Sequence, residues 1–179
     1  MPRRVLLIGL DSMDAGLVQQ WAADGTLPTF AALMAGGCFA DCDNPPGFIA
    51  SVSLWPTFYT GASPADHGRY AYRQLARAGY STRITSPSEL RVAPFWRHLS
   101  EAGRRVALLD VPSAVAIGPI NGKQLAYWGP HDVEDECHTW PPQWRDEFLA
   151  RYGREPVGEC DFGGNGPRSL PVFRDHLLA

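Results

Sequence analysis

Short apolar runs alternate with helical patterns along this chain, and this alternation constrains the fold more than any other feature. Apolar runs of about four to eight residues between polar turns are typical of buried strands, and apolar residues three and four apart are typical of helices. Strands are expected at residues 5–10, 38–43, 80–84, 105–111 and 124–128, and helices at residues 14–23, 29–35, 51–60, 94–101 and 141–152. Strands alternating with helices predict an α/β fold in three layers, α/β/α, with a mainly parallel sheet.

Length and charge narrow the class of protein. The chain has 179 residues, so a single α/β domain over residues 1–179 is expected. A net charge of −3 gives no broad attraction for nucleic acid. No apolar run approaches the roughly 20 residues that span a bilayer, and the run at 5–10 is shorter than the about 7–15 apolar residues of a secretory signal. We therefore expect a cytoplasmic protein that binds neither nucleic acid nor a membrane.

The four cysteines, Cys38, Cys42, Cys137 and Cys160, lack the paired spacing of a zinc site. On an extended strand, Cys38 and Cys42 would lie about 13 Å apart, which is too far for a disulfide or a shared metal. Free or structural thiols are expected.

Asp11 directly follows the first expected strand. Sites in parallel sheets form beyond the carboxyl ends of the strands, and a carboxylate there binds divalent metals through oxygen. An aspartate after a strand is also a common turn or capping residue, so both interpretations of Asp11 are open. Asp14 is expected to be the N-cap of the helix over residues 14–23.

Ser51 opens the expected helix over residues 51–60, which Gly61 ends. A serine alcohol needs a base or a metal to remove its proton, and the positive end of a helix helps to bind phosphate. Ser51 would have both if Asp11 held a metal nearby. The competing interpretation is that Ser51 is only an N-cap. The sequence contains neither a Gly-x-Ser-x-Gly elbow nor a nucleotide-binding P-loop.

Several segments, in a fixed order, resemble the alkaline phosphatase superfamily and, within it, the type I phosphodiesterase/nucleotide pyrophosphatase branch. They are residues 5–11, ending in Asp11; residues 27–37, beginning Leu-Pro-Thr-Phe; and residues 51–68, running from Ser51 through Thr60-Gly61 to Pro64 and His67-Gly68. Shorter segments at 110–112, 121–122 and 128–132 also resemble this branch. The resemblance covers most of residues 4–132 and, more loosely, 140–160.

The resemblance implies an alkaline phosphatase-like fold and a hydrolase that cleaves a small phosphate ester through a covalent enzyme–phosphate intermediate. It implies two divalent metal ions, expected to be zinc, with Asp11 as the first ligand and Ser51 as the nucleophile. The family's other aspartate and histidine ligands lie in the second half of its fold, so the chain is expected to be an incomplete, N-terminal part of such an enzyme. His67 is expected to tie the helix end to the sheet, and His131 and Asp132 lie in the wrong region to be the missing ligands.

Two positions depart from the family pattern. Ser53 stands where members usually have proline, and the proline of this chain is Pro56, so Ser53 is an alternative nucleophile if the helix start has shifted. Tyr72 stands near the place of an asparagine that stabilises charge on the phosphate in pyrophosphatase-like members. A changed substrate preference, or help from Arg73, is expected.

The leading hypothesis is therefore a metal-dependent phosphoric ester hydrolase with Ser51 as nucleophile and Asp11 as metal ligand. The alternative is a truncated, non-catalytic alkaline phosphatase-like module that binds a partner or a phosphate ligand. Cleavage of sulfate esters or phosphonates fits less well. Sulfatase-like members generally have a modifiable cysteine with a nearby arginine at the nucleophile position, whereas this chain has Ser51 and Trp55 there.

Overall fold

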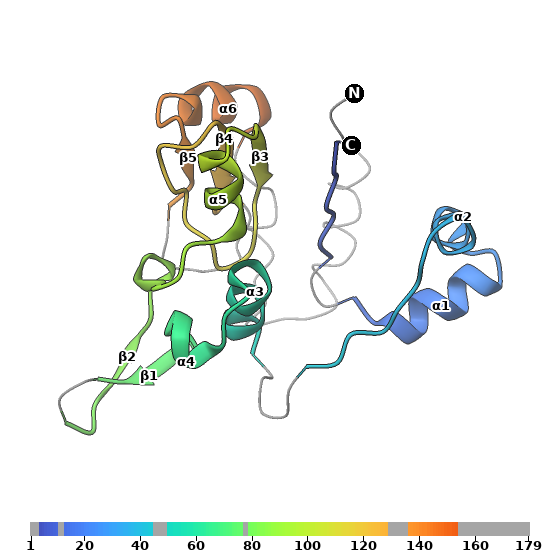
Figure 1. The fold of residues 1–179 in the computed structure, drawn as a ribbon, viewed down its shortest axis with the longest axis horizontal. Coiled ribbons are helices and arrows are strands. Elements are labelled where there is room, and N and C mark those ends of the chain that lie inside the picture. Colours follow the sequence, from blue (N-terminus) through green and yellow to red (C-terminus); the bar gives the residue numbers. More distant parts are fainter. Residues whose placement is uncertain (1–3, 11–12, 45–49, 77–78, 129–135, 154–179) are drawn as a thin grey trace. The chain divides into compact units, whose positions relative to one another are not determined.

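The computed structural model describes residues 4–10, 13–44, 50–76, 79–128 and 136–153 (Figure 1). The chain forms two compact units, Met1–Pro45 and Pro46–Ala179, here named unit 1 and unit 2. The described elements are helices and small sheets, which is compatible with the expected α/β class. The three-layer arrangement, the mainly parallel sheet and the single domain stay predictions.

Unit 1 contains two short helices, α1 (Ala15–Ala23) and α2 (Pro28–Gly36), which contact each other. Asp14 is the N-cap of α1, and its Oδ1 accepts the Leu17 N–H at 2.9 Å, which satisfies one of the free donors at the helix start. Pro28 begins α2, where its fixed φ suits the first turn and its missing N–H needs no partner. Both helix predictions are confirmed.

The two strands predicted for unit 1 are wrong. Residues 5–10 and 38–43 lie outside helices and strands, and their side chains are exposed, with Val5 at 90% and Leu6 at 84%. A strand needs a neighbour to pair its backbone N–H and C=O groups, and the described elements of unit 1 are helices. The apolar pattern at these residues is that of a strand, but the described part of unit 1 contains no strand to pair with it.

Unit 2 begins with two helices. α3 (Ser51–Thr60) ends at Gly61, whose φ of +66° is a left-handed conformation that glycine adopts without strain. α4 (Pro64–His67) follows after a short turn and contacts α3. The helix predicted at 51–60 and its end at Gly61 are confirmed.

An antiparallel pair of strands, β1 (Arg73–Leu75) and β2 (Thr82–Ile84), follows α4. A short 3-10 helix, Pro87–Glu89, comes next, and Glu89 accepts two hydrogen bonds of 2.6 Å from the Arg83 guanidinium of β2. This contact, helped by a backbone N–H, lowers the pKa of Glu89 to about 2. The ion pair joins the strand to the helix that follows it.

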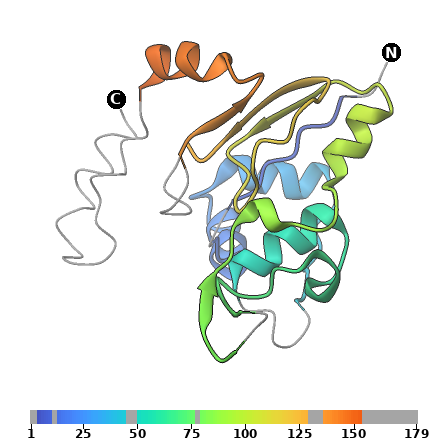
Figure 2. The same ribbon diagram turned by 90° about the vertical axis from the view of Figure 1, so that its left-hand side faces the viewer.

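A three-stranded sheet in the order β3–β4–β5 forms another part of unit 2 (Figure 2). β3 (Val106–Leu109) pairs in parallel with β4 (Gly122–Ala126), and β4 pairs antiparallel with β5 (His138–Trp140). β3 and β4 correspond to the strands predicted at 105–111 and 124–128. No strand was predicted at β5.

Two helices flank this sheet: α5 (Phe95–Glu101) contacts β3, and α6 (Trp144–Tyr152) contacts β5. α6 begins after the predicted start at Pro141 because a second proline follows, and a residue before proline is biased away from the helical conformation. The ammonium nitrogen of Lys123, in β4, lies 4.6 Å from the centre of the Trp144 ring, a cation–π contact between sheet and helix.

The core of unit 2 joins α3, α5 and the segment that follows β3. Tyr59, Trp96 and Ala114 are buried at its centre, and the Tyr59 and Trp96 rings lie 5.0 Å apart. Partly buried apolar side chains surround them: Trp55, Leu90, Val106, Leu108, Val111 and Ile117. Burial of these groups fixes α3 against the end of β3.

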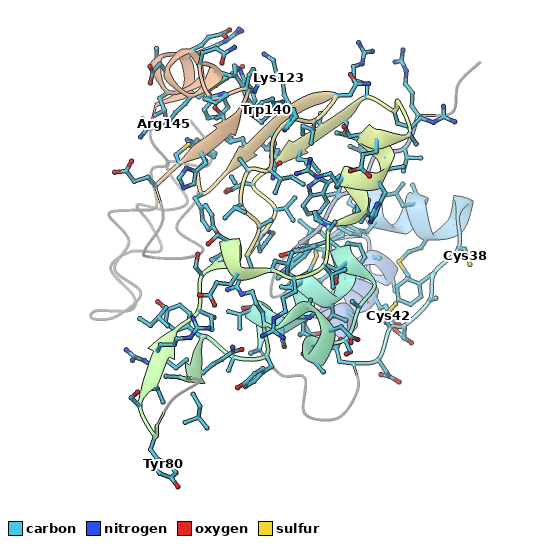
Figure 3. All side chains as sticks on the ribbon, turned by 60° about the vertical axis from the view of Figure 1, so that its left-hand side comes forward. Cys38, Cys42, Tyr80, Lys123, Trp140 and Arg145 are labelled. Atoms are coloured by element: carbon cyan, nitrogen blue, oxygen red, sulfur yellow. The ribbon has the colours of Figure 1, made fainter. Side chains whose placement is uncertain are left out.

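Two further findings bear on the class of protein. No helix in the described ranges is both long enough and apolar enough to cross a membrane. Cys38 and Cys42 are free thiols, as expected, and Figure 3 labels both. Cys160 lies outside the described residues.

Candidate functional site

Ser51 is the first residue of α3, and its side chain is exposed. The N-cap is Ala50, with extended φ and ψ of −104° and 132° and no side-chain cap hydrogen bond. The interpretation of Ser51 as the N-cap is therefore wrong. Within the part of the chain that the structure describes, the Ser51 hydroxyl has no hydrogen-bond partner. It lies at the positive end of the helix dipole.

Ser53, two residues further along α3, has the opposite environment. Its side chain is only 2% exposed, and its Oγ donates to the Ala50 carbonyl at 2.9 Å. It lies on the buried face of the helix together with Val52, Pro56 and Tyr59. The helix begins at Ser51, so the shifted start that would favour Ser53 as nucleophile is not found.

His67, at the end of α4, is fully buried. Its Nε2 lies 3.0 Å from Thr57 Oγ1 on α3, and its Nδ1 accepts the Arg69 N–H at 3.2 Å. Burial lowers the pKa of His67, the Arg69 guanidinium lowers this pKa further, and Asp66 opposes the shift. The expected structural role is found with a different partner, because His67 joins α4 to α3 rather than to the sheet.

Two buried or strained residues near these helices were not predicted from the sequence to have a role. Arg69 is 1% exposed, and its Nη1 donates to the Ser113 carbonyl at 3.2 Å. Asp110 follows β3 with a left-handed φ of 47°, and its Oδ1 accepts the Trp128 N–H at 3.0 Å. Asp110 has the same sequence signal as Asp11, an aspartate after an apolar run, whereas nothing in the sequence marks Arg69 as buried.

Of the other residues that the sequence singles out, three are not described. Asp11, His131 and Asp132 lie outside the described residues. Arg73 is an exposed residue that begins β1. Across the described ranges, no group of three or more His, Cys, Asp or Glu side chains is arranged to hold a metal ion. The described residues therefore do not form a metal site by themselves.

Residues 5–162 match the family model described as type I phosphodiesterase / nucleotide pyrophosphatase, and the chain belongs to this family. This is a family of hydrolases of the phosphodiesterase and pyrophosphatase type. Comparisons with curated proteins and with solved structures gave no match.

Proposed function

We propose that this chain carries the nucleophile of a metal-dependent phosphoric ester hydrolase, and that the nucleophile is Ser51. The observation that carries the proposal is the environment of this alcohol. It is exposed at the start of a ten-residue helix and is not engaged as a cap, in a member of a phosphodiesterase family. Ser53, buried and bonded to the Ala50 carbonyl, is a poorer candidate.

The reaction forms a bond from Ser51 Oγ to phosphorus while the bond from phosphorus to the leaving oxygen breaks. The serine proton passes to solvent, and the leaving oxygen takes up a proton. Water then attacks phosphorus and restores the alcohol. Backbone N–H groups in the first turn of α3 favour the negative phosphoryl oxygens, since the helix N-terminus carries a partial positive charge.

The metal part of the proposal rests on the family and on Asp11. We expect two divalent ions, with zinc the expected metal and Asp11 a ligand. When bound, such ions lower the pKa of an attacking alcohol and neutralise a leaving oxygen. A pair of ions about 3.5–4 Å apart needs several ligands, and the described residues contain no cluster that fits them. We therefore expect further ligands from residues outside the described ranges.

The proposed substrate class is a small phosphate ester. The test measures turnover of bis(p-nitrophenyl) phosphate by the full-length protein with excess zinc. Ser51→Ala should abolish turnover, and mass spectrometry of the quenched wild-type reaction should find phosphate on the peptide that contains Ser51. Ser81→Ala, at an exposed serine between β1 and β2, is the matched control and should keep full activity.

Other outcomes separate the alternatives. Turnover that survives Ser51→Ala but not Ser53→Ala would move the nucleophile to Ser53. A folded wild-type protein with neither turnover nor a phosphate adduct would favour the non-catalytic module that binds a partner or a phosphate ligand.

A further inference from the structure

Helix α3 contains a proline near the turn that carries Ser51. Pro56 has no N–H, so the backbone hydrogen bond that would join it to the Val52 carbonyl does not form. Four such bonds normally link the first turn of a helix to the next, and here one of them is missing. The position of the Ser51 alcohol therefore depends on what else holds this first turn.

The Thr57 side chain supplies a further link across the same point. Its Oγ1 donates to the Ser53 carbonyl at 2.8 Å. Ser53 directly follows Val52, whose carbonyl lacks its helical donor because Pro56 has no N–H. His67 lies behind Thr57, with Nε2 at 3.0 Å from Thr57 Oγ1. His67 is fully buried, so these hydrogen bonds are shielded from competing water.

The donor and the acceptor of each hydrogen bond in this series, from Arg69 through His67 and Thr57 to Ser53, follow from their chemistry. The Arg69 backbone N–H can only donate, and it points to His67 Nδ1, so Nδ1 carries no proton. The neutral imidazole then has its proton on Nε2 and donates to Thr57 Oγ1. The hydroxyl proton of Thr57 goes in turn to the Ser53 carbonyl.

At its other end, this series of hydrogen bonds is held by the segment after β3, through Arg69. Arg69 Nη1 donates to the Ser113 carbonyl at 3.2 Å, and Tyr59 Oη donates to the same oxygen at 2.7 Å. Both contacts are buried. The first turn of α3 is thereby connected, through His67 and Arg69, to the core of unit 2 rather than only to its own helix.

We infer that Thr57 and His67 are positioning residues, which hold the first turn of α3 so that the Ser51 alcohol keeps its orientation. The inference rests on the proposed function, because it assigns Ser51 the role of nucleophile. Neither residue needs to touch the substrate.

The test uses two threonines of the same helix with the same local bond. Thr60 Oγ1 donates to the Pro56 carbonyl at 2.6 Å, one turn beyond Thr57 and without a link to His67. In the full-length protein, Thr57→Val should lower kcat about tenfold and leave KM within about twofold, because misplacement of a reacting group slows the chemical step. Thr57→Ser keeps the hydroxyl and should restore most of the rate, and Thr60→Val should leave kcat unchanged.

Hydrogen exchange read by mass spectrometry gives a second measurement that needs no activity. The amides of Ser53, Leu54, Trp55 and Thr57 should exchange several times faster in Thr57→Val than in Thr60→Val. Equal kcat and equal exchange in these two variants would overturn the inference. Should Ser51→Ala lose turnover while Thr57→Val behaves as wild type, the inference fails and the proposed function stands. Should Ser51→Ala keep turnover, the proposed function fails, and the exchange rates still decide whether Thr57 holds the first turn.

Discussion

At the scale of single residues, His67 shows how burial and a neighbouring charge determine a protonation state. Its imidazole is fully buried, accepts a backbone N–H at Nδ1 and lies near the guanidinium of Arg69. A second proton would remove that acceptor and place a positive charge beside another one. The folded protein therefore favours the neutral imidazole, and its pKa lies below the ordinary value of about 6.5.

This lowered pKa makes stability depend on pH in a known direction. As the pH falls below about 6.5, the unfolded chain binds a proton at this histidine before the folded chain does, so the free energy of unfolding decreases. The slope is at most about 1.4 kcal/mol per pH unit for one proton, and the loss ends once the folded-state pKa is passed. More than about one pH unit above 6.5, the residue causes almost no pH dependence.

Urea unfolding at pH 7.5 and pH 5.5 measures this effect. His67→Gln should lose less stability between the two pH values than wild type does, because glutamine does not titrate. His98→Gln, at an exposed histidine of α5, should retain the wild-type difference. Identical pH differences in wild type and His67→Gln would contradict the prediction.

The sequence predicts the helix around Ser51 but not the roles of its two serines. N-cap and first helical residue differ by one position, and the extended backbone of Ala50 decides between them. The burial of Ser53 had a sequence signal, since it lies three residues before Pro56 and shares its face. The contact from Thr57 to His67 joins residues of different helices, so no local pattern reveals it.

At the scale of elements, the parallel pair β3–β4 constrains the residue type at Gly122. Gly122 lies opposite Val106 in the register, and its φ of +152° is a conformation that side chains rarely adopt. A Cβ at this position would overlap the carbonyl oxygen of Val106. The first residue of β4 must therefore be glycine for the two strands to pair in this register.

Gly122→Ala should consequently reduce the free energy of unfolding by about 3 kcal/mol or more, because it adds a steric overlap to a strained backbone. Gly36→Ala is the control, since a Cβ there meets nothing within 4 Å and the residue ends a helix. The control should be neutral or stabilising by up to about 1 kcal/mol. Chemical denaturation of both variants checks the prediction, and a Gly122→Ala protein as stable as the control would refute it.

Helices were predicted better than strands, for a physical reason. Capping at Asp14, Pro28 at a helix start and Gly61 at a helix end act within a few residues, so the local sequence is sufficient. A strand depends on a partner that the local sequence does not specify. β3 and β4 formed because each run has the other as a partner, whereas the described part of unit 1 offers no strand to the equally apolar run at residues 5–10.

At the scale of the whole molecule, residues 5–10 are the largest departure from expectation. Val5, Leu6, Leu7 and Ile8 are 61–90% exposed. Consecutive exposed apolar residues favour association between chains. The structure thus predicts that this segment limits solubility, whereas the sequence pattern predicts that the same segment is buried and stabilises the fold.

Leu6→Lys separates these two views, because they predict effects of opposite sign. If the segment is exposed, a charge at Leu6 changes the free energy of unfolding by no more than about 0.5 kcal/mol and reduces self-association in light scattering. If the segment is a buried strand, the same charge destabilises the protein by several kcal/mol. We expect the first result. Leu33→Lys, at a single leucine of α2 that is 66% exposed, is the control for added charge and should reduce association less, since it leaves the run at residues 5–10 intact.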